Sequence, residues 1–146
     1  MAVKAIPEGF HNATPWLVVK GAAKLIDFLK QAFDAKERSR MPGPGGDIMH
    51  AEVQIGDSII MMNDAMQQDG PMPAAIYLYV NDVDATHKRA VGAGATSRLE
   101  PADMFWGDRM SQVKDPFGNI WSIATHKEDL TPQEQEKRAQ AFFKQS

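Results

Sequence analysis

The chain has 146 residues, 43% hydrophobic and 24% charged, which suits one globular domain with a buried core. Its net charge of −3 argues against a nucleic-acid partner, and the absence of cysteine excludes disulfides and zinc–thiolate sites. No apolar run approaches the ~20 residues of a membrane span, and the N-terminus lacks the apolar stretch of a signal peptide, so we expect a cytoplasmic protein that contacts no membrane.

The first half of the chain predicts a strand, a helix and three more strands. A short apolar run, 16–19, precedes a segment with helical apolar spacing, whose shared face carries Ala22, Leu25, Ile26, Leu29 and Phe33. Strands are expected at 36–41, 48–55 and 58–63. Gly56 and Asp57 predict a tight two-residue hairpin between the last two strands.

The second half repeats this order. A strand at 76–80 precedes a helix with an apolar face formed by Val83, His87, Ala90 and Val91. Strands follow at 96–100, 106–114 and 120–125, with an Asp-Pro-Phe-Gly turn before the last.

The repeat predicts an α+β fold, because the order β-α-β-β-β occurs twice. We expect one domain over 1–146, with modules at about 11–63 and 74–126, a linker at 64–73, and a cupped mixed sheet flanked by helices. A C-terminal helix is expected at about 131–144, with Thr131 as N-cap, and it would pack on the domain edge or on a second subunit.

Three segments, VKGAAKLIDFLKQAF, GDSIIMMND and KDPFGNIWSIATH, stand in this order. Together they resemble the vicinal-oxygen-chelate superfamily, which includes glyoxalase I, bleomycin-resistance proteins and extradiol dioxygenases. The resemblance covers roughly 14–126. MPGPGGDIMHAE and FWGDRMSQVKDPFG look most like the subgroup of the phosphonate-operon B protein. The resemblance implies paired modules around a pocket and, as in other small members, a homodimer with sites near the subunit contact.

The resemblance also implies four metal-ligand positions, which fall here on Thr14, Met61, Ala75 and Ser122. None of these is a side chain that a hard or borderline metal prefers. We therefore expect no metal and no cofactor at the usual site, which moves the expected role from metal chemistry towards binding.

Strand alternation predicts the lining of the cup. The Gly56-Asp57 turn pairs Ile55 with Ser58, and closing the last hairpin on its turn pairs Val113 with Ile120. The predicted inward residues are Trp16, His50, Glu52, Met61, Asn63, Tyr77, Tyr79, Arg109, Ser111 and Ser122, with Trp106 closing one end.

Several of these residues have more than one interpretation. Arg109 would either clamp a carboxylate or phosphonate, or pair with Glu52 or Asp108 as a structural salt bridge. His50 and Glu52 would form an acid–base pair, share a metal, or make a structural hydrogen bond. The nine methionines either line an adaptable cavity or fill the core. The remaining histidines, His11, His87 and His126, are expected at the surface.

The sequence favours a metal-independent protein of the glyoxalase/bleomycin-resistance type that binds a small organic molecule. One alternative is a lyase or isomerase in which His50 and Glu52 move protons, or which uses a metal at a non-standard site. Another is an interaction module whose cup is filled by side chains.

Overall fold

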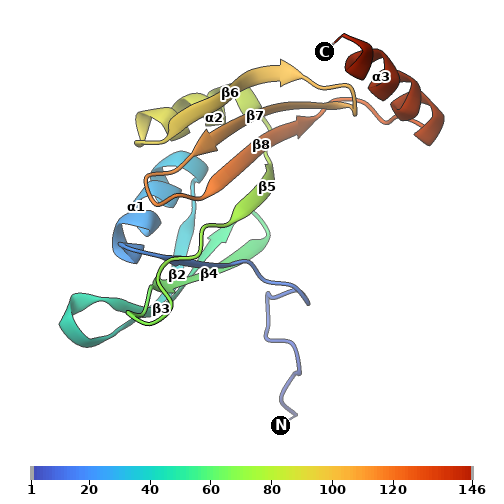
Figure 1. Ribbon diagram of the computed structural model, residues 1–146. Helices are drawn as coiled ribbons and strands as arrows, with labels where there is room; N and C mark the ends of the chain where they lie inside the picture. The colour runs from blue at the N-terminus through green and yellow to red at the C-terminus, as the bar shows by residue number, and fades with distance from the viewer. Residues whose placement is uncertain (1, 146) are drawn as a thin grey trace.

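The computed structural model describes residues 2–145, which form two four-stranded sheets, three α-helices and one short 3₁₀ helix (Figure 1). In chain order the elements are β1 (Trp16–Val19), α1 (Ala22–Phe33), β2 (Lys36–Pro42), η1 (Pro44–Gly46), β3 (Ile48–Ile55), β4 (Ser58–Asp64), β5 (Ala75–Tyr79), α2 (Val83–Gly92), β6 (Thr96–Asp103), β7 (Asp108–Lys114), β8 (Ile120–His126) and α3 (Pro132–Lys144).

The two sheets have the same topology. Their strand orders are β1-β4-β3-β2 and β5-β8-β7-β6, and in each sheet the first strand runs parallel to the last while the other pairs are antiparallel. The predicted α+β fold with two βαβββ modules and a C-terminal helix is therefore confirmed.

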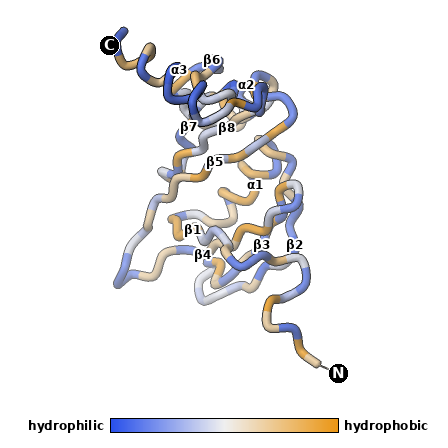
Figure 2. The backbone as a smooth tube through the Cα atoms, turned by 90° about the vertical axis from the view of Figure 1, so that its right-hand side faces the viewer, coloured by the Kyte–Doolittle hydropathy of each residue, from blue (hydrophilic) through white to orange (hydrophobic). Residues whose placement is uncertain are grey.

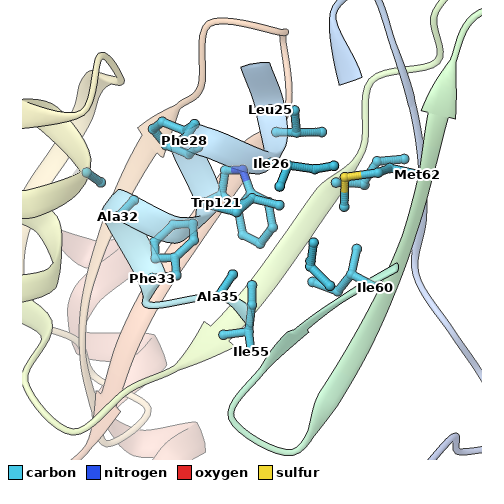
Figure 3. Packing of buried hydrophobic residues seen from close by; sticks show 14 of the residues in the cluster. Leu25, Ile26, Phe28, Ala32, Phe33, Ala35, Ile55, Ile60, Met62 and Trp121 are labelled. Carbon is cyan, nitrogen blue, oxygen red and sulfur yellow. The ribbon is translucent and has the colours of Figure 1, made fainter. Parts of the chain in front are cut away.

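The hydrophobic core lies where the helices meet both sheets. The predicted apolar face of α1 is fully formed, since Leu25, Ile26 and Leu29 are completely buried. Phe33 of α1 lies 4.9 Å from Trp121 of β8, measured between ring centroids, so one cluster joins the two modules (Figure 3). Hydrophobic residues dominate α1, whereas α3 is largely hydrophilic (Figure 2). Each sheet thus buries one face under the helices and turns the other outward.

The first hairpin has the register that the sequence predicts, with Ile55 opposite Ser58 and Glu52 opposite Met61. The register predicted for the second hairpin is wrong by one residue. Lys114 pairs with Ile120, Gln112 with Ser122 and Arg109 with Thr125.

The cause of this difference is the buried carboxylate of Asp115, which organises a five-residue turn. It accepts hydrogen bonds from the backbone of Phe117 and Asn119, from the Asn119 side chain, and from the indole of Trp121. These bonds end the strand pairing one residue later than the turn sequence suggested.

The corrected register reverses the side-chain directions along β7. Ser111 and Val113 are fully buried on the helix-covered face instead of facing the ligand. His87 is also buried, at 5% exposure, so its expected surface position is wrong. It reaches this environment because its Nδ1 lies 2.8 Å from the Ser111 hydroxyl oxygen, which supplies a polar partner inside the core.

The C-terminal helix α3 lies beside the second sheet and away from the first (Figure 1). Thr131 caps it as predicted, its side chain accepting a hydrogen bond from the Glu134 backbone N–H. Phe142 and Phe143 contact the ring of Phe105, and other parts of α3 are mostly exposed. Within 2–145, no helix combines the length and apolar character needed to cross a membrane.

Candidate functional site

Most of the side chains predicted to line the cup lie on the outward faces of the two sheets. The first open face carries Trp16, His50, Glu52, Met61 and Asn63. The second open face carries Tyr77, Tyr79, Asp108, Gln112 and Ser122. The expectation that both faces enclose one cup within a single chain is wrong, because α1 and α2 pack between the sheets and each open face points away from the shared core.

On the first open face an amide holds an exposed indole. The Nε1–H of Trp16 donates to Asn63 Oδ1 at 2.5 Å, and Trp16 is also the strand partner of Met61. The indole stays 57% exposed, so its orientation is fixed while its ring remains open to solvent.

His50 and Glu52 form a hydrogen-bonded pair on the same face. His50 Nε2 lies 3.0 Å from Glu52 Oε2, and both side chains are partly exposed. Further along β3, the side-chain oxygen of Gln54 accepts a hydrogen bond from Arg38 of β2 at 3.4 Å. This geometry suits both a structural hydrogen bond and an acid–base pair.

The second open face is organised by Asp108, a residue whose only expected role from the sequence is as a partner of Arg109. Its Oδ2 accepts hydrogen bonds from the hydroxyls of Tyr77 (2.7 Å) and Tyr79 (2.9 Å) and from the indole of Trp106 (3.2 Å). Asp108 is only 3% exposed. Trp106 lies in the turn before β7, not in the strand as predicted. Strand alternation would have identified Asp108 had the register of the second hairpin been right.

A histidine completes this arrangement. His126 Nδ1 lies 2.9 Å from Asp108 Oδ1, and His126 Nε2 lies 2.8 Å from Asp129. We call these six residues the Asp108 cluster: Tyr77, Tyr79, Trp106, Asp108, His126 and Asp129.

Burial and hydrogen bonding shift the pKa values of several groups in the Asp108 cluster. Burial acts to raise the pKa of Asp108, but the hydrogen bonds from His126, the tyrosines and Trp106 outweigh it and leave the pKa below its ordinary value. Burial, with the hydrogen bond to Asp108, raises the pKa of Tyr77 to about 12. The hydrogen bonds to Asp108 and Asp129 raise the pKa of His126. At neutral pH the carboxylate is therefore ionised and the phenols remain donors.

Arg109 and Ser111 do not join this face. Arg109 lies on the helix-covered side, where it donates to Asp84 at 3.0 and 3.1 Å and to Asp103 at 3.2 Å. From this side of the sheet Arg109 cannot clamp an anion on the open face, and its salt bridges are not to Glu52 or Asp108. Both expected roles are therefore wrong. Ser122 stays on the second open face, where its hydroxyl accepts a hydrogen bond from Gln112.

Three cavities border these faces. One of about 680 Å³ lies between the first hairpin and the start of α2, with Tyr77 and Tyr79 in its wall. One of about 420 Å³ is lined by Tyr79, Val80, Asn81, Thr125 and His126. A third, of about 460 Å³, is lined partly by Met49 and Met66, whereas Met62 is fully buried, so methionines serve in this protein both as cavity walls and as core.

The four positions implied by the family resemblance occupy equivalent places in the two modules. Met61 pairs with Trp16 in the first, and Ser122 pairs with Tyr77 in the second. Thr14 comes just before β1 and Ala75 begins β5. Within 2–145, no three or more histidine, aspartate or glutamate side chains are grouped as a metal ion would need.

Comparison with known proteins agrees with the fold. The profile of the Glyoxalase/Bleomycin resistance protein/Dioxygenase superfamily matches residues 10–123. The chain belongs to this superfamily. An uncharacterized protein of Mycobacterium bovis is 44% identical over 121 residues, which cover 75% of this chain and 80% of the relative.

Solved structures resemble this chain as well. TioX from Micromonospora sp. ML1 has a TM-score of 0.66 at 25% identity, over 79% of this chain and 99% of that one. TnmS3, described as an antibiotic binding protein from Streptomyces sp. CB03234, has a TM-score of 0.62 at 21% identity, over 80% and 98% of the two chains, and shows a shared fold only. Placement in the phosphonate-operon B subgroup stays a prediction.

Proposed function

We propose that this member of the superfamily binds a small organic molecule without a metal, by stacking it against the aromatic side chains of its open faces. The observation that carries the proposal is that these rings are exposed to solvent while hydrogen bonds hold their orientation. Trp16, Tyr77 and Tyr79 are 57%, 42% and 60% exposed, yet each is held by a hydrogen bond to its own sheet. Exposed apolar surface of this kind marks binding sites, and rings already held in place lose little entropy on binding.

The donor set at the expected metal positions supports a metal-independent role. Thr14, Met61, Ala75 and Ser122 offer two hydroxyls, a thioether and a methyl group. Divalent metals in this superfamily would need carboxylate or imidazole ligands, so these four residues do not fit such an ion.

In this proposal, two copies of the chain form each pocket together. One chain turns its two open faces outward, and each is a half-site with solvent on its free side. In a homodimer, the first open face of one copy would lie against the second open face of the other. Each of the two composite pockets would then contain Trp16 from one subunit and Tyr77 and Tyr79 from its partner, as twofold symmetry requires.

Two variants test this arrangement. Trp16→Ala and Tyr79→Ala each remove a ring from a different open face, so each homodimer should lose binding of a planar aromatic probe such as quinoline, measured by calorimetry. Mixing the two under subunit exchange creates heterodimers in which one pocket has both faces intact. About a quarter of the pockets should then bind like wild type.

Three outcomes would contradict the composite pocket or the binding function. If a single chain formed the whole pocket, mixing would restore no binding. Sedimentation of the wild-type protein provides the matching measurement, because a monomer at all concentrations would contradict the composite pocket. Wild-type protein that binds no planar aromatic probe in millimolar calorimetry would contradict the binding function itself.

A second candidate function is proton transfer by His50 and Glu52, favoured by their 3.0 Å hydrogen bond on the first open face. The pair would act in a lyase- or isomerase-type reaction, with Glu52 orienting the imidazole. Replacing His50 by Ala should abolish turnover of any substrate found for the protein while affecting its binding less. Unchanged turnover in His50→Ala would rule this function out.

A further inference from the structure

The Asp108 cluster joins one buried negative charge to three aromatic donors. The two phenols and the Trp106 indole all donate to the same carboxylate oxygen. A hydrogen bond donated to an anion polarises the donor, which makes its ring richer in electrons. Aromatic rings of this kind attract cations to their faces by cation–π interaction.

Within residues 2–145, no Lys or Arg side chain neutralises the negative charge of the cluster. Among residues 2–145, none hydrogen bonds or ion-pairs with its members, and Arg109 is held by Asp84 and Asp103 on the opposite face of the same sheet. The one positive charge available inside the cluster is that of His126, which lies between the carboxylates of Asp108 and Asp129. The cluster therefore keeps a net negative charge even when His126 is protonated.

The ring faces are accessible although the carboxylate is not. The ring centroids of Tyr77 and Tyr79 lie 5.3 Å apart, and the two ring planes are inclined to each other by 53°. The cavity of about 420 Å³ opens beside Tyr79 and His126. Asp108 itself is 3% exposed and its oxygens already accept four hydrogen bonds, so it has no free position for a metal ion.

We propose that the Asp108 cluster selects an organic cation, an alkylated or aromatic ammonium group, which lies against the rings of Tyr77 and Tyr79. This inference rests on the proposed binding function and names its ligand class. It replaces the anionic ligand that the predicted position of Arg109 had suggested.

Three probes of similar bicyclic shape test the charge preference: N-methylquinolinium, quinoline and 1-naphthoate. Binding to the full-length protein is measured by calorimetry at pH 8, where quinoline is neutral. We expect the cation to bind about tenfold more tightly than quinoline, and naphthoate to bind most weakly. Naphthoate binding as tightly as the cation would overturn the cation preference and leave the binding function standing. Failure of all three probes would overturn both.

Variants locate the preference. Asp108→Asn removes the charge and should reduce the cation's advantage over quinoline to less than about threefold. Asp84→Asn is the matched control, an equal loss of charge in α2, where Asp84 pairs with Arg109 on the opposite side of the same sheet. Tyr79→Leu, at an exposed position that should tolerate the change, removes the ring and should weaken the cation even if Asp108→Asn does not fold. An unchanged cation preference in Tyr79→Leu, or an equal loss in Asp84→Asn, would contradict the assignment.

Discussion

The two open faces have the same strand order but hold their aromatic side chains by different chemistry. On the first, a neutral amide, Asn63, accepts one hydrogen bond from Trp16. On the second, the buried carboxylate of Asp108 accepts from Tyr77, Tyr79 and Trp106 together. A charged acceptor makes stronger hydrogen bonds and connects its donors, so the second face should be the more rigid of the two.

The turns of the two hairpins also differ, and again a buried aspartate is found only in the second. Gly56 and Asp57 close the first with a two-residue turn, in which the Asp57 carboxylate accepts a hydrogen bond from the Ser58 hydroxyl. The second closes around Asp115, whose buried carboxylate accepts four hydrogen bonds from its own turn and from Trp121. In both contrasts, the second module relies on a buried aspartate where the first does not.

The largest effect is expected for Asp115→Ala. Removing this carboxylate leaves four donors without their acceptor, two of them on the fully buried Asn119 and Trp121 side chains. We expect the free energy of unfolding to fall by at least about 3 kcal/mol in urea denaturation. Asp57→Ala, in the corresponding turn of the first module, should change it by less than about 0.5 kcal/mol. Equal losses would mean that the two turns contribute alike.

Asp108→Ala should have the next largest effect. Its donors are partly exposed, so water can replace some of the lost hydrogen bonds, and we expect a loss of about 2 kcal/mol in the same assay. Asn63→Ala, on the first open face, removes one neutral acceptor and should cost less than about 1 kcal/mol. A larger loss in Asn63→Ala than in Asp108→Ala would reverse the comparison.

These contrasts also explain how far sequence patterns can predict this molecule. Elements and topology followed from apolar periodicity, because a helix such as α1 must bury one face and the pattern shows which. The first hairpin was predicted in register because a two-residue turn with Gly56 leaves few alternatives. The second was missed because its register depends on the Asp115 side chain, which forms hydrogen bonds inside the turn that the backbone pattern does not contain.

That single shift decides which residues of β7 lie on the second open face. It exchanged Arg109 and Ser111 for Asp108 and Gln112 on the open face. On β3 and β4, by contrast, His50, Glu52 and Met61 share one face of the sheet, as the predicted register requires. The expectation of one cup failed for a different reason: the relative placement of two modules depends on contacts such as Phe33 with Trp121, which join positions far apart in the chain.

The pH dependence of stability should also separate the modules. Bonds to Asp108 and Asp129 raise the pKa of His126 in the folded protein above its ordinary value of 6.5. Protonated His126 therefore stabilises the fold; the contribution is complete below pH 6.5 and is lost as the pH rises through the folded pKa. The difference in unfolding free energy between wild type and His126→Gln should shrink across this interval.

Asp129→Asn serves as the control for this pH effect, because it removes one of the two negative charges beside His126 and leaves Asp108 in place. It should keep part of the pH dependence and move its midpoint towards lower pH. A difference between wild type and His126→Gln that grows as the pH rises would contradict the assigned direction.

The smallest effect is a coupling energy, and it tests whether the aromatic residues of the second face act as one unit. Tyr79 and Trp106 donate to the same oxygen of Asp108, so Tyr79→Phe and Trp106→Phe should be non-additive by at least about 0.5 kcal/mol in a double-mutant cycle. Trp16 and Trp106 share no hydrogen-bond partner, so the changes Trp16→Phe and Trp106→Phe should add within about 0.3 kcal/mol. Additivity in both cycles would mean that Asp108 binds its donors independently. Coupling in the first cycle alone would show that one carboxylate holds the rings of the second face together, which is the property that the proposed cation site requires.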